Sequence, residues 1–181
     1  MIRDTFDAGV EPGGLHSHNE IKLLVCYMLA NVPEPMSRES IVNVLCGHGM
    51  ANFFDVSTVM ADLLSLCNLK EDELGRLTVT DIGRDAALTL KDMLPFTLRE
   101  RSVEAAKRLL IRLRNERENR VEICREGNGY TITCTVGDTD TPLMTLSLLV
   151  GSEKQAEAIR ERFLNDPLSL YRAVIDSVSG S

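Results

Sequence analysis

The sequence of 181 residues is poor in aromatic side chains, with five Phe, three Tyr and no Trp. Proteins that bind single-stranded nucleic acids stack bases on aromatic rings, so this scarcity counts against that class. Long apolar runs are missing too, because the densest stretch, residues 21–30, already contains Lys22 and falls short of the roughly 18 residues of a membrane span. Residues 1–20 carry charges and no apolar core, unlike a secretory signal. We therefore expect a cytoplasmic protein with no membrane partner.

Motifs for catalysis and for cofactors are also missing. The five cysteines form no CxxC pair, and four of them lie in apolar-periodic segments, where a thiol behaves as a small core residue. There is no phosphate-binding loop, dinucleotide fingerprint or nucleophile elbow. His16 and His18 have the spacing of two metal ligands, but no third ligand follows from the sequence. We expect no enzyme, no cofactor and no metal site.

Basic residues are outnumbered overall but concentrated in one band. The net charge is −7, and residues 1–98 hold seven basic against fourteen acidic side chains. The band from Arg99 to Arg125 reverses this balance, with nine basic against five acidic. Two interpretations stay open: a surface for DNA or an acidic protein partner, or a solvated helix face with internal pairs such as Glu104 with Arg108.

The apolar pattern predicts three short helices in the first half. The first begins at Asn19 and ends before Pro33, the second follows an N-cap at Ser37, and the third begins near Asp55 and has Cys67 inward. Strands at 68–71 and 76–80 then flank a turn that contains Gly75. Thr80 caps a fourth helix to about Met93, and its expected inward residues are Ile82, Ala86, Leu90 and Met93.

The longest helical pattern runs from Leu98 to about Arg120. Its 3-4-3 spacing of apolar residues is that of a short coiled-coil seam and predicts a homodimer contact. Packing inside one subunit is the alternative, because fewer than three heptads are present. The residues of this seam are Val103, Ala106, Leu110 and Leu113.

Three strands and two helices follow, over residues 121–125, 130–136 and 143–150 for the strands. The first two strands join through Gly127-Asn128-Gly129, and Asn-Gly is a strong hairpin signal. The alternation of the second strand predicts one apolar face and one threonine-rich face. Ser152 with Gln155 indicates a capping box, and Asp166-Pro167 starts the last helix.

These elements define an α+β protein with two domains. The boundary is expected at Leu94-Pro95, which gives domains over residues 1–94 and 95–181. The first has the order of a winged helix-turn-helix, namely three helices and a two-stranded wing. The second is built on a long helix, a three-stranded antiparallel sheet and two helices, and is expected to serve dimerisation or ligand sensing.

Several segments together resemble a bacterial family of unknown function whose N-terminal half is a PadR-like winged helix-turn-helix. The resemblance spans nearly the whole chain, and it implies the fold of a transcription regulator without an operator, ligand or catalytic residue to carry over. The segments that carry it are residues 7–15 (DAGVEPGGL), 19–22 (NEIK), 51–54 (ANFF), 77–84 (LTVTDIGR), 99–101 (RER) and 117–123 (RENRVEI).

In a winged helix the third helix enters the major groove of DNA and the wing contacts the flanking backbone. We therefore expect double-stranded DNA as the partner, with Ser57, Thr58 and Ser65 facing it. Arg38, Lys70 and Arg76 are expected at the phosphates. The third helix has no basic residue, and its Asp62 is expected to face the groove and repel the phosphates. The wing tip is acidic too. Because of this, a winged helix that has lost DNA binding and serves protein interaction or dimerisation is the alternative function.

Overall fold

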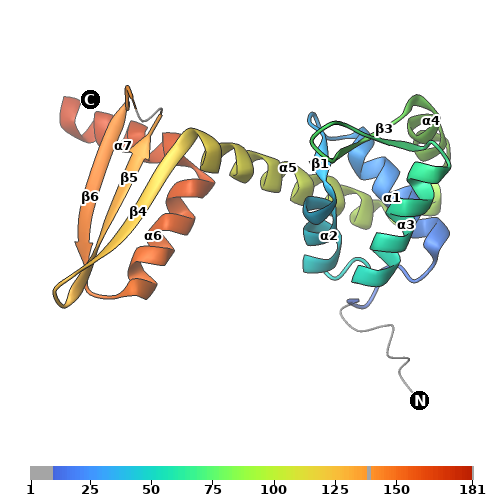
Figure 1. The fold of residues 1–181 in the computed structure, drawn as a ribbon, viewed down its shortest axis with the longest axis horizontal. Helices are drawn as coiled ribbons and strands as arrows, with labels where there is room; N and C mark the ends of the chain where they lie inside the picture. The colour runs from blue at the N-terminus through green and yellow to red at the C-terminus, as the bar shows by residue number, and fades with distance from the viewer. Residues whose placement is uncertain (1–9, 138–139, 181) are drawn as a thin grey trace, which may run out of the picture. The chain divides into compact units, whose positions relative to one another are not determined.

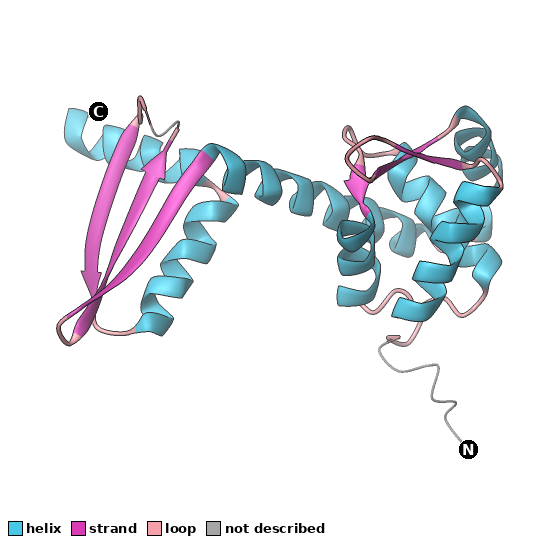
Figure 2. Cartoon of the chain, viewed as in Figure 1, coloured by secondary structure: helices cyan, strands magenta, loops and turns pink. Residues whose placement is uncertain are grey.

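The computed structural model describes residues 10–137 and 140–180 and has a mixed α+β architecture, as the sequence predicts. The described residues form seven α-helices and two three-stranded antiparallel sheets (Figure 1, Figure 2). By its internal contacts the chain divides into two units, Met1–Leu110 and Ile111–Ser181.

The first unit contains α1 (His18–Ala30), β1 (Met36–Ser37), α2 (Arg38–Gly47), α3 (Phe53–Ser65), β2 (Leu69–Glu71), β3 (Arg76–Val79), α4 (Asp81–Leu90) and the short helix η2 (Lys91–Met93). Helix α5 (Phe96–Glu118) crosses the division between the units. The second unit continues with β4 (Asn119–Glu126), β5 (Gly129–Val136), β6 (Met144–Val150), α6 (Glu153–Asn165) and α7 (Pro167–Ser179). The sequence predicts each of these elements except β1, with ends that differ by a few residues.

Side-chain caps explain where three helices of the first unit begin. Ser37, Asn52 and Thr80 each accept a hydrogen bond from the backbone N–H three residues further on. Such a cap satisfies one of the N–H groups that have no partner inside the helix. The caps at Ser37 and Thr80 are as predicted, but Asn52 starts α3 two residues earlier than predicted. At α1 the N-cap position is Ser17 rather than Asn19.

The sheet of the first unit has the strand order β1-β3-β2. In the central strand β3, Leu77 pairs with Met36 of β1 and with Glu71 of β2. The β2–β3 hairpin turns at Gly75, whose φ of 73° suits glycine. The sequence does not reveal β1, because a strand of two residues is too short to show any alternation.

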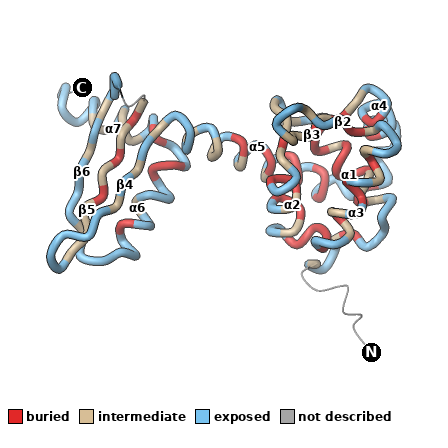
Figure 3. The backbone as a smooth tube through the Cα atoms, in the orientation of Figure 1, coloured by how far each residue is buried: buried red, intermediate tan, exposed pale blue. Residues whose placement is uncertain are grey.

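The core of the first unit draws apolar side chains from its helices, from β3 and from the first part of α5 (Figure 3). Ile41 and Leu77 are fully buried there. Ala106 and Leu110 belong to the same core, so the first unit extends into α5. The sequence places the boundary earlier, at Leu94-Pro95, because Pro95 marks the start of a helix and the pattern alone does not show which core that helix joins.

Helix α4 faces the core with small side chains, which corrects the sequence prediction. Gly83 and Ala87 are its buried residues. A Cβ at Gly83 would lie 2.3 Å from the carbonyl oxygen of Asn68, so glycine is required for this close approach. The residues that were predicted to face inward are all exposed: Ile82, Ala86, Leu90 and Met93.

The sequence also predicts that the Cys67 side chain faces the core. This prediction is wrong, and the C-terminus of α3 shows why. Cys67 is exposed, and its φ of 57° is left-handed. The Cys67 N–H bonds to the Leu64 carbonyl at 3.0 Å, and the Asn68 N–H bonds to the Leu63 carbonyl at 2.9 Å. This is the hydrogen-bond pattern of a Schellman cap, which ends the helix and turns Cys67 away from its apolar face.

In the second unit β4, β5 and β6 form an antiparallel meander with β5 in the middle. Glu126 pairs with Gly129, so the β4–β5 hairpin has a two-residue loop of Gly127 and Asn128. Gly127 has a φ of 58°, as a type II′ turn requires at its first loop position. The predicted hairpin is confirmed, although Gly127-Asn128 rather than Asn128-Gly129 forms the turn.

The alternation of β5 produces the second core. Ile132, Cys134 and Val136 are buried and pack with Ala156 and Phe163 of α6. The opposite face of the strand has the three threonines that the sequence predicts there, Thr131, Thr133 and Thr135. The two faces of the sheet therefore differ as expected for a half-buried antiparallel sheet.

Helices α6 and α7 complete the second unit. Ser152 caps α6 by accepting a hydrogen bond from the Gln155 N–H, while the Gln155 side chain accepts one from the Gly151 N–H. Asp166 caps α7 in the same way. Pro167 is the only buried residue of α7, so this helix covers the core only partly.

Candidate nucleic-acid interface

Helix α3 presents its polar side chains away from the core. Thr58 and Ser65 are exposed and Ser57 is half-buried, whereas Val56 and Val59 are buried. The Ser65 hydroxyl donates a hydrogen bond of 2.8 Å to a backbone carbonyl of the same helix. The three residues that the sequence assigns to DNA therefore lie on the accessible side of α3.

The acidic residues of α3 are held by α1. Lys22 Nζ lies 2.8 Å from Asp62 Oδ2, and His18 Nε2 lies 2.9 Å from Asp55 Oδ1. The sequence suggests that Asp62 repels phosphates, but in the structure the Lys22 ammonium compensates its charge. Lys22 is the one charged residue in the apolar stretch 21–30, which is the signal that sequence reasoning missed.

Two of the three predicted phosphate contacts are already in ion pairs. Arg38 Nη2 lies 2.8 Å from Glu71 Oε2, and this hydrogen bond raises the pKa of Arg38 and lowers the pKa of Glu71. Arg76 Nε donates to Asp72 Oδ2 at 2.8 Å. Within the described ranges Lys70 makes no ion pair. Exposed pairs of this kind contribute little stability, so a phosphate competes with the carboxylate at small cost.

The tip of the β2–β3 hairpin is a preformed and acidic turn. Asp72 Oδ1 accepts hydrogen bonds from the backbone N–H groups of Leu74, at 3.0 Å, and of Arg76, at 2.9 Å. These bonds favour the ionised form, and the backbone bond from Arg76 is the main reason why the pKa of Asp72 is lowered. Glu73 and Leu74 are exposed beside it. The tip therefore combines negative charge with an exposed apolar side chain.

The first cations of the basic band lie in the first unit. Arg99 is 8% exposed, and its guanidinium carbon lies 5.6 Å from the ring centroid of Tyr27. It also approaches Asp92 at 3.3 Å. Arg101 pairs with Glu11 at 3.3 Å. Arg99 therefore serves packing within the unit, since a cation over an aromatic face is stabilised by the ring quadrupole.

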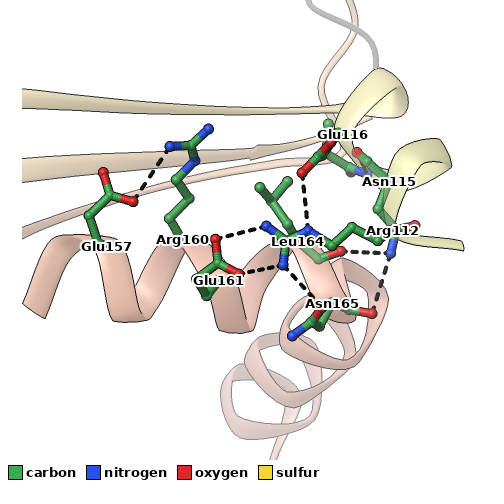
Figure 4. Close-up of polar contacts among 9 residues, drawn as sticks. Arg112, Asn115, Glu116, Glu157, Arg160, Glu161, Leu164 and Asn165 are labelled. Carbon is green, nitrogen blue, oxygen red and sulfur yellow. Dashed lines mark hydrogen bonds and ion pairs between the residues drawn. The ribbon is translucent and has the colours of Figure 1, made fainter. Parts of the chain in front are cut away.

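Arg112 anchors the end of α5 to α6 within the second unit (Figure 4). Its guanidinium forms two hydrogen bonds to Glu161, one of them at 2.8 Å, and a third to Glu116 at 3.1 Å. The bonds to Glu161 raise the pKa of Arg112 and lower that of Glu161. Asn115 adds a hydrogen bond of 2.9 Å to the Leu164 carbonyl.

Other pairs in the band match the second interpretation. The predicted pair of Glu104 with Arg108 is present, and Arg120 pairs with Glu122. Together with Arg112 these contacts support a helix face whose cations are compensated inside the chain. A partner that binds the band from Arg99 to Arg125 stays a prediction.

Most of the predicted coiled-coil seam is buried within the chain. Val103, Ala106 and Leu110 are buried, and Leu113 is half-buried. This matches the alternative in which the seam packs inside one subunit, because side chains already covered have little apolar area left for a second copy. A dimer contact through α5 stays a prediction.

A cavity of about 570 Å³ lies between α1 and α4 in the first unit. Leu23, Cys26, Leu63 and Leu90 are among its apolar lining residues, and Lys22 is among the polar ones. Burial raises the pKa of the Cys26 thiol to about 11, so this thiol is neutral at physiological pH. The sequence does not indicate this cavity, because it depends on how closely two helices approach.

Among residues 10–137 and 140–180 no three metal-ligating side chains gather into a group. His18, one of the two histidines with ligand-like spacing, has Asp55 as its partner instead. None of the helices in the described part of the chain has the length and apolar character needed to span a membrane.

The chain matches a family described as a domain of unknown function (DUF4364) over residues 21–178, and it therefore belongs to that family. No curated protein and no solved structure matches the chain.

Proposed function

We propose that the first unit is a winged helix-turn-helix and that the protein is a transcription regulator that binds double-stranded DNA. The order of its elements carries this proposal: α1, β1, α2 and α3 are followed by the β2–β3 hairpin, with β1 beside β3. In a winged helix a short strand, here β1, completes the sheet beside the two strands of the wing. The sequence pattern that suggested the fold did not include this strand.

In this proposal α3 is the recognition helix. Its second turn has exposed or half-buried hydroxyls at Ser57 and Thr58, and serine and threonine hydroxyls donate hydrogen bonds to phosphate oxygens. Ser65 lies two turns further along. Because Asp55 and Asp62 are paired with α1, the groove-facing side of α3 is less acidic than the composition of the helix suggests.

The hairpin is the wing, and its cations bind phosphate by exchange. Among the described residues no carboxylate is paired with Lys70, whereas Arg38 and Arg76 exchange Glu71 and Asp72 for phosphate oxygens. Few net cations are available, so we expect weak and salt-dependent binding to duplexes of random sequence. Specific affinity then depends on the sequence and shape of the DNA.

The second candidate function is a winged helix that binds protein instead of DNA. It is favoured by exposed apolar residues on the same two elements, α3 and the β2–β3 hairpin. Phe53 and Phe54 are 56% and 69% exposed at the start of α3, with ring centroids 5.7 Å apart, and Leu74 is 75% exposed at the hairpin tip. Aromatic residues are enriched where protein partners bind.

Fluorescence anisotropy with a random-sequence duplex, at low and at physiological salt, separates the two candidates. The DNA regulator binds at low salt, and its affinity falls as salt rises. Lys70→Glu should weaken binding about tenfold, whereas Lys154→Glu, the same change at an exposed position of α6, should have little effect. Absence of binding at low salt would favour the protein-binding candidate.

A pair of charge-matched variants sharpens this test. Glu71→Gln removes the partner of Arg38, while Glu73→Gln removes an equal charge from an exposed residue of the same hairpin. If Arg38 contacts phosphate, Glu71→Gln strengthens binding several-fold more than Glu73→Gln does. Equal effects would mean that Arg38 does not contact DNA.

A further inference from the structure

The two outer strands of the second-unit sheet differ in how their edges are protected. Strand β6, with the sequence MTLSLLV, has no charged residue and no proline. In the sheet order β4-β5-β6, no strand among the described residues lies beyond β6 (Figure 1). Free edges are usually protected by charge, proline or cover. The opposite edge, β4, has such charges at Arg120, Glu122, Arg125 and Glu126.

The register shows which backbone groups of β6 point outward. Glu126 and Gly129 close a two-residue hairpin, so they are a hydrogen-bonded pair, and bonded pairs alternate along antiparallel strands. Strand β5 therefore bonds to β4 at residue 129 and every second residue after it, and to β6 at the residues in between. In β6 the N–H and C=O groups of Thr145, Ser147 and Leu149 consequently point away from β5.

We propose that β6 pairs with β6 of a second copy of this chain, antiparallel and about a two-fold axis at Ser147. In this register Ser147 lies opposite Ser147 of the partner subunit, and Thr145 lies opposite the partner's Leu149. Both are bonded pairs, so all the outward groups of the strand find partners. The pairing brings no like charges together, because the strand has none.

The same register continues the apolar face of the sheet. Leu146 and Leu148 are on the face of β6 that also has Cys134 and Ile132 on β5. About the axis at Ser147, Leu146 lies opposite the partner's Leu148, so two leucine pairs extend the core across the interface. A shift by one residue would place leucine against the polar face instead.

The core next to this edge is incomplete in a single chain. A cavity of about 260 Å³ lies under β6, lined by Leu146, Leu148, Phe163 and Leu170 among others. Leu148 is 38% exposed, whereas Ile132, its neighbour on β5, is fully buried. A strand added at the usual spacing of about 4.8 Å would cover Leu148. The pairing is independent of the proposed function, since a regulator and a protein-binding module have the same edge.

Sedimentation of the full chain tests the interface with two proline variants. Ser147→Pro removes an N–H that points outward from β6, so it costs no backbone hydrogen bond inside the chain, only the exposed side-chain bond of 2.9 Å between Ser147 Oγ and Thr133 Oγ1. Arg125→Pro is the matched control, because the N–H of Arg125 points outward at the other edge. We expect a dimer for the wild type and for Arg125→Pro, and at least a hundredfold higher dissociation constant for Ser147→Pro with an unchanged far-UV circular dichroism spectrum.

Cysteine cross-linking tests the register, in a background with the exposed Cys67 and Cys124 changed to serine. Ser147→Cys places two thiols across a bonded pair, about 5.5 Å apart at Cα, which is within disulfide range. It should form a covalent dimer, while Thr145→Cys, away from the axis, should not. A monomeric wild type, or a dimer that Ser147→Pro leaves intact, would overturn the proposal.

Discussion

The two units of the chain bury their apolar residues to different depths. Of the twelve largest fully buried side chains, Ile132 alone belongs to the second unit. In the first unit several helices pack around β3. In the second unit only α6 and part of α7 cover one face of the sheet (Figure 3). The first unit therefore has the deeper core, and the second covers its apolar residues less completely.

Core truncation should show this difference most strongly. Leu45→Ala removes a fully buried side chain of the first unit and should cost about 3–5 kcal/mol, because the surrounding core collapses only partly. Leu170→Ala, at a half-buried position of α7, should cost about 1 kcal/mol. Urea unfolding followed by circular dichroism measures both, and equal losses would mean that the second core is as tightly packed as the first.

Alkaline pH should weaken the first unit through Cys26. Burial raises the pKa of this thiol from 9.0 to about 11, so the folded protein keeps a proton that the unfolded chain loses. The resulting stabilisation is complete below about pH 9 and is lost as pH rises to 11, by about 2–3 kcal/mol. Urea midpoints between pH 8 and 11 should show this slope in the wild type and in Cys67→Ala, and a shallower one in Cys26→Ala, because burial also raises the pKa of Cys46 and of Cys134.

Removing a helix cap should lower the free energy of unfolding more in the first unit than in the second. The Thr80 hydroxyl caps α4 and also donates to the Cys67 carbonyl at 2.7 Å, whereas Ser152 Oγ only caps α6, at 3.3 Å. Thr80→Ala should therefore cost about 1–2 kcal/mol and Ser152→Ala about 0.5–1 kcal/mol. Thermal unfolding gives both values, and Thr80→Ser should restore most of the loss.

The smallest effect is expected from the Arg112–Glu161 pair of the second unit. Glu161 is more than half exposed, so Arg112→Met should cost only about 0.5–1 kcal/mol. Because Arg112 lowers the pKa of Glu161, the stabilisation is present above the ordinary glutamate pKa and is lost as pH falls through the lowered value. Unfolding at pH 7 and at pH 3 should show a larger gap between wild type and variant at pH 7.

Local signals predicted most of the fold. Ser37 and Thr80 are capping residues directly before apolar periodicity, and the alternation of β5 identified its buried face correctly. The failures have a common cause in tertiary packing. The strand β1 exists through its pairing with Leu77, and α4 turns its small residues inward because Gly83 must approach Asn68 closely.

The candidate site was predictable in its residues but not in its electrostatics. Sequence spacing placed Ser57, Thr58 and Ser65 on the accessible side of α3, as the structure has them. The ion pairs of Asp62 with Lys22 and of Arg38 with Glu71 join residues more than 30 positions apart. Local spacing carries no information about such contacts, so the sequence alone overstated the repulsion from Asp62 and the availability of Arg38.

Helix α5 has a consequence for how the chain opens. It runs unbroken through the division at Leu110, and Leu110 is anchored in one core while Arg112 is tied to α6. Its backbone hydrogen bonds around this point are therefore held from both ends. In native-state hydrogen exchange, the amides in the middle of α5 should belong to no single foldon and should exchange only through the opening of one whole unit.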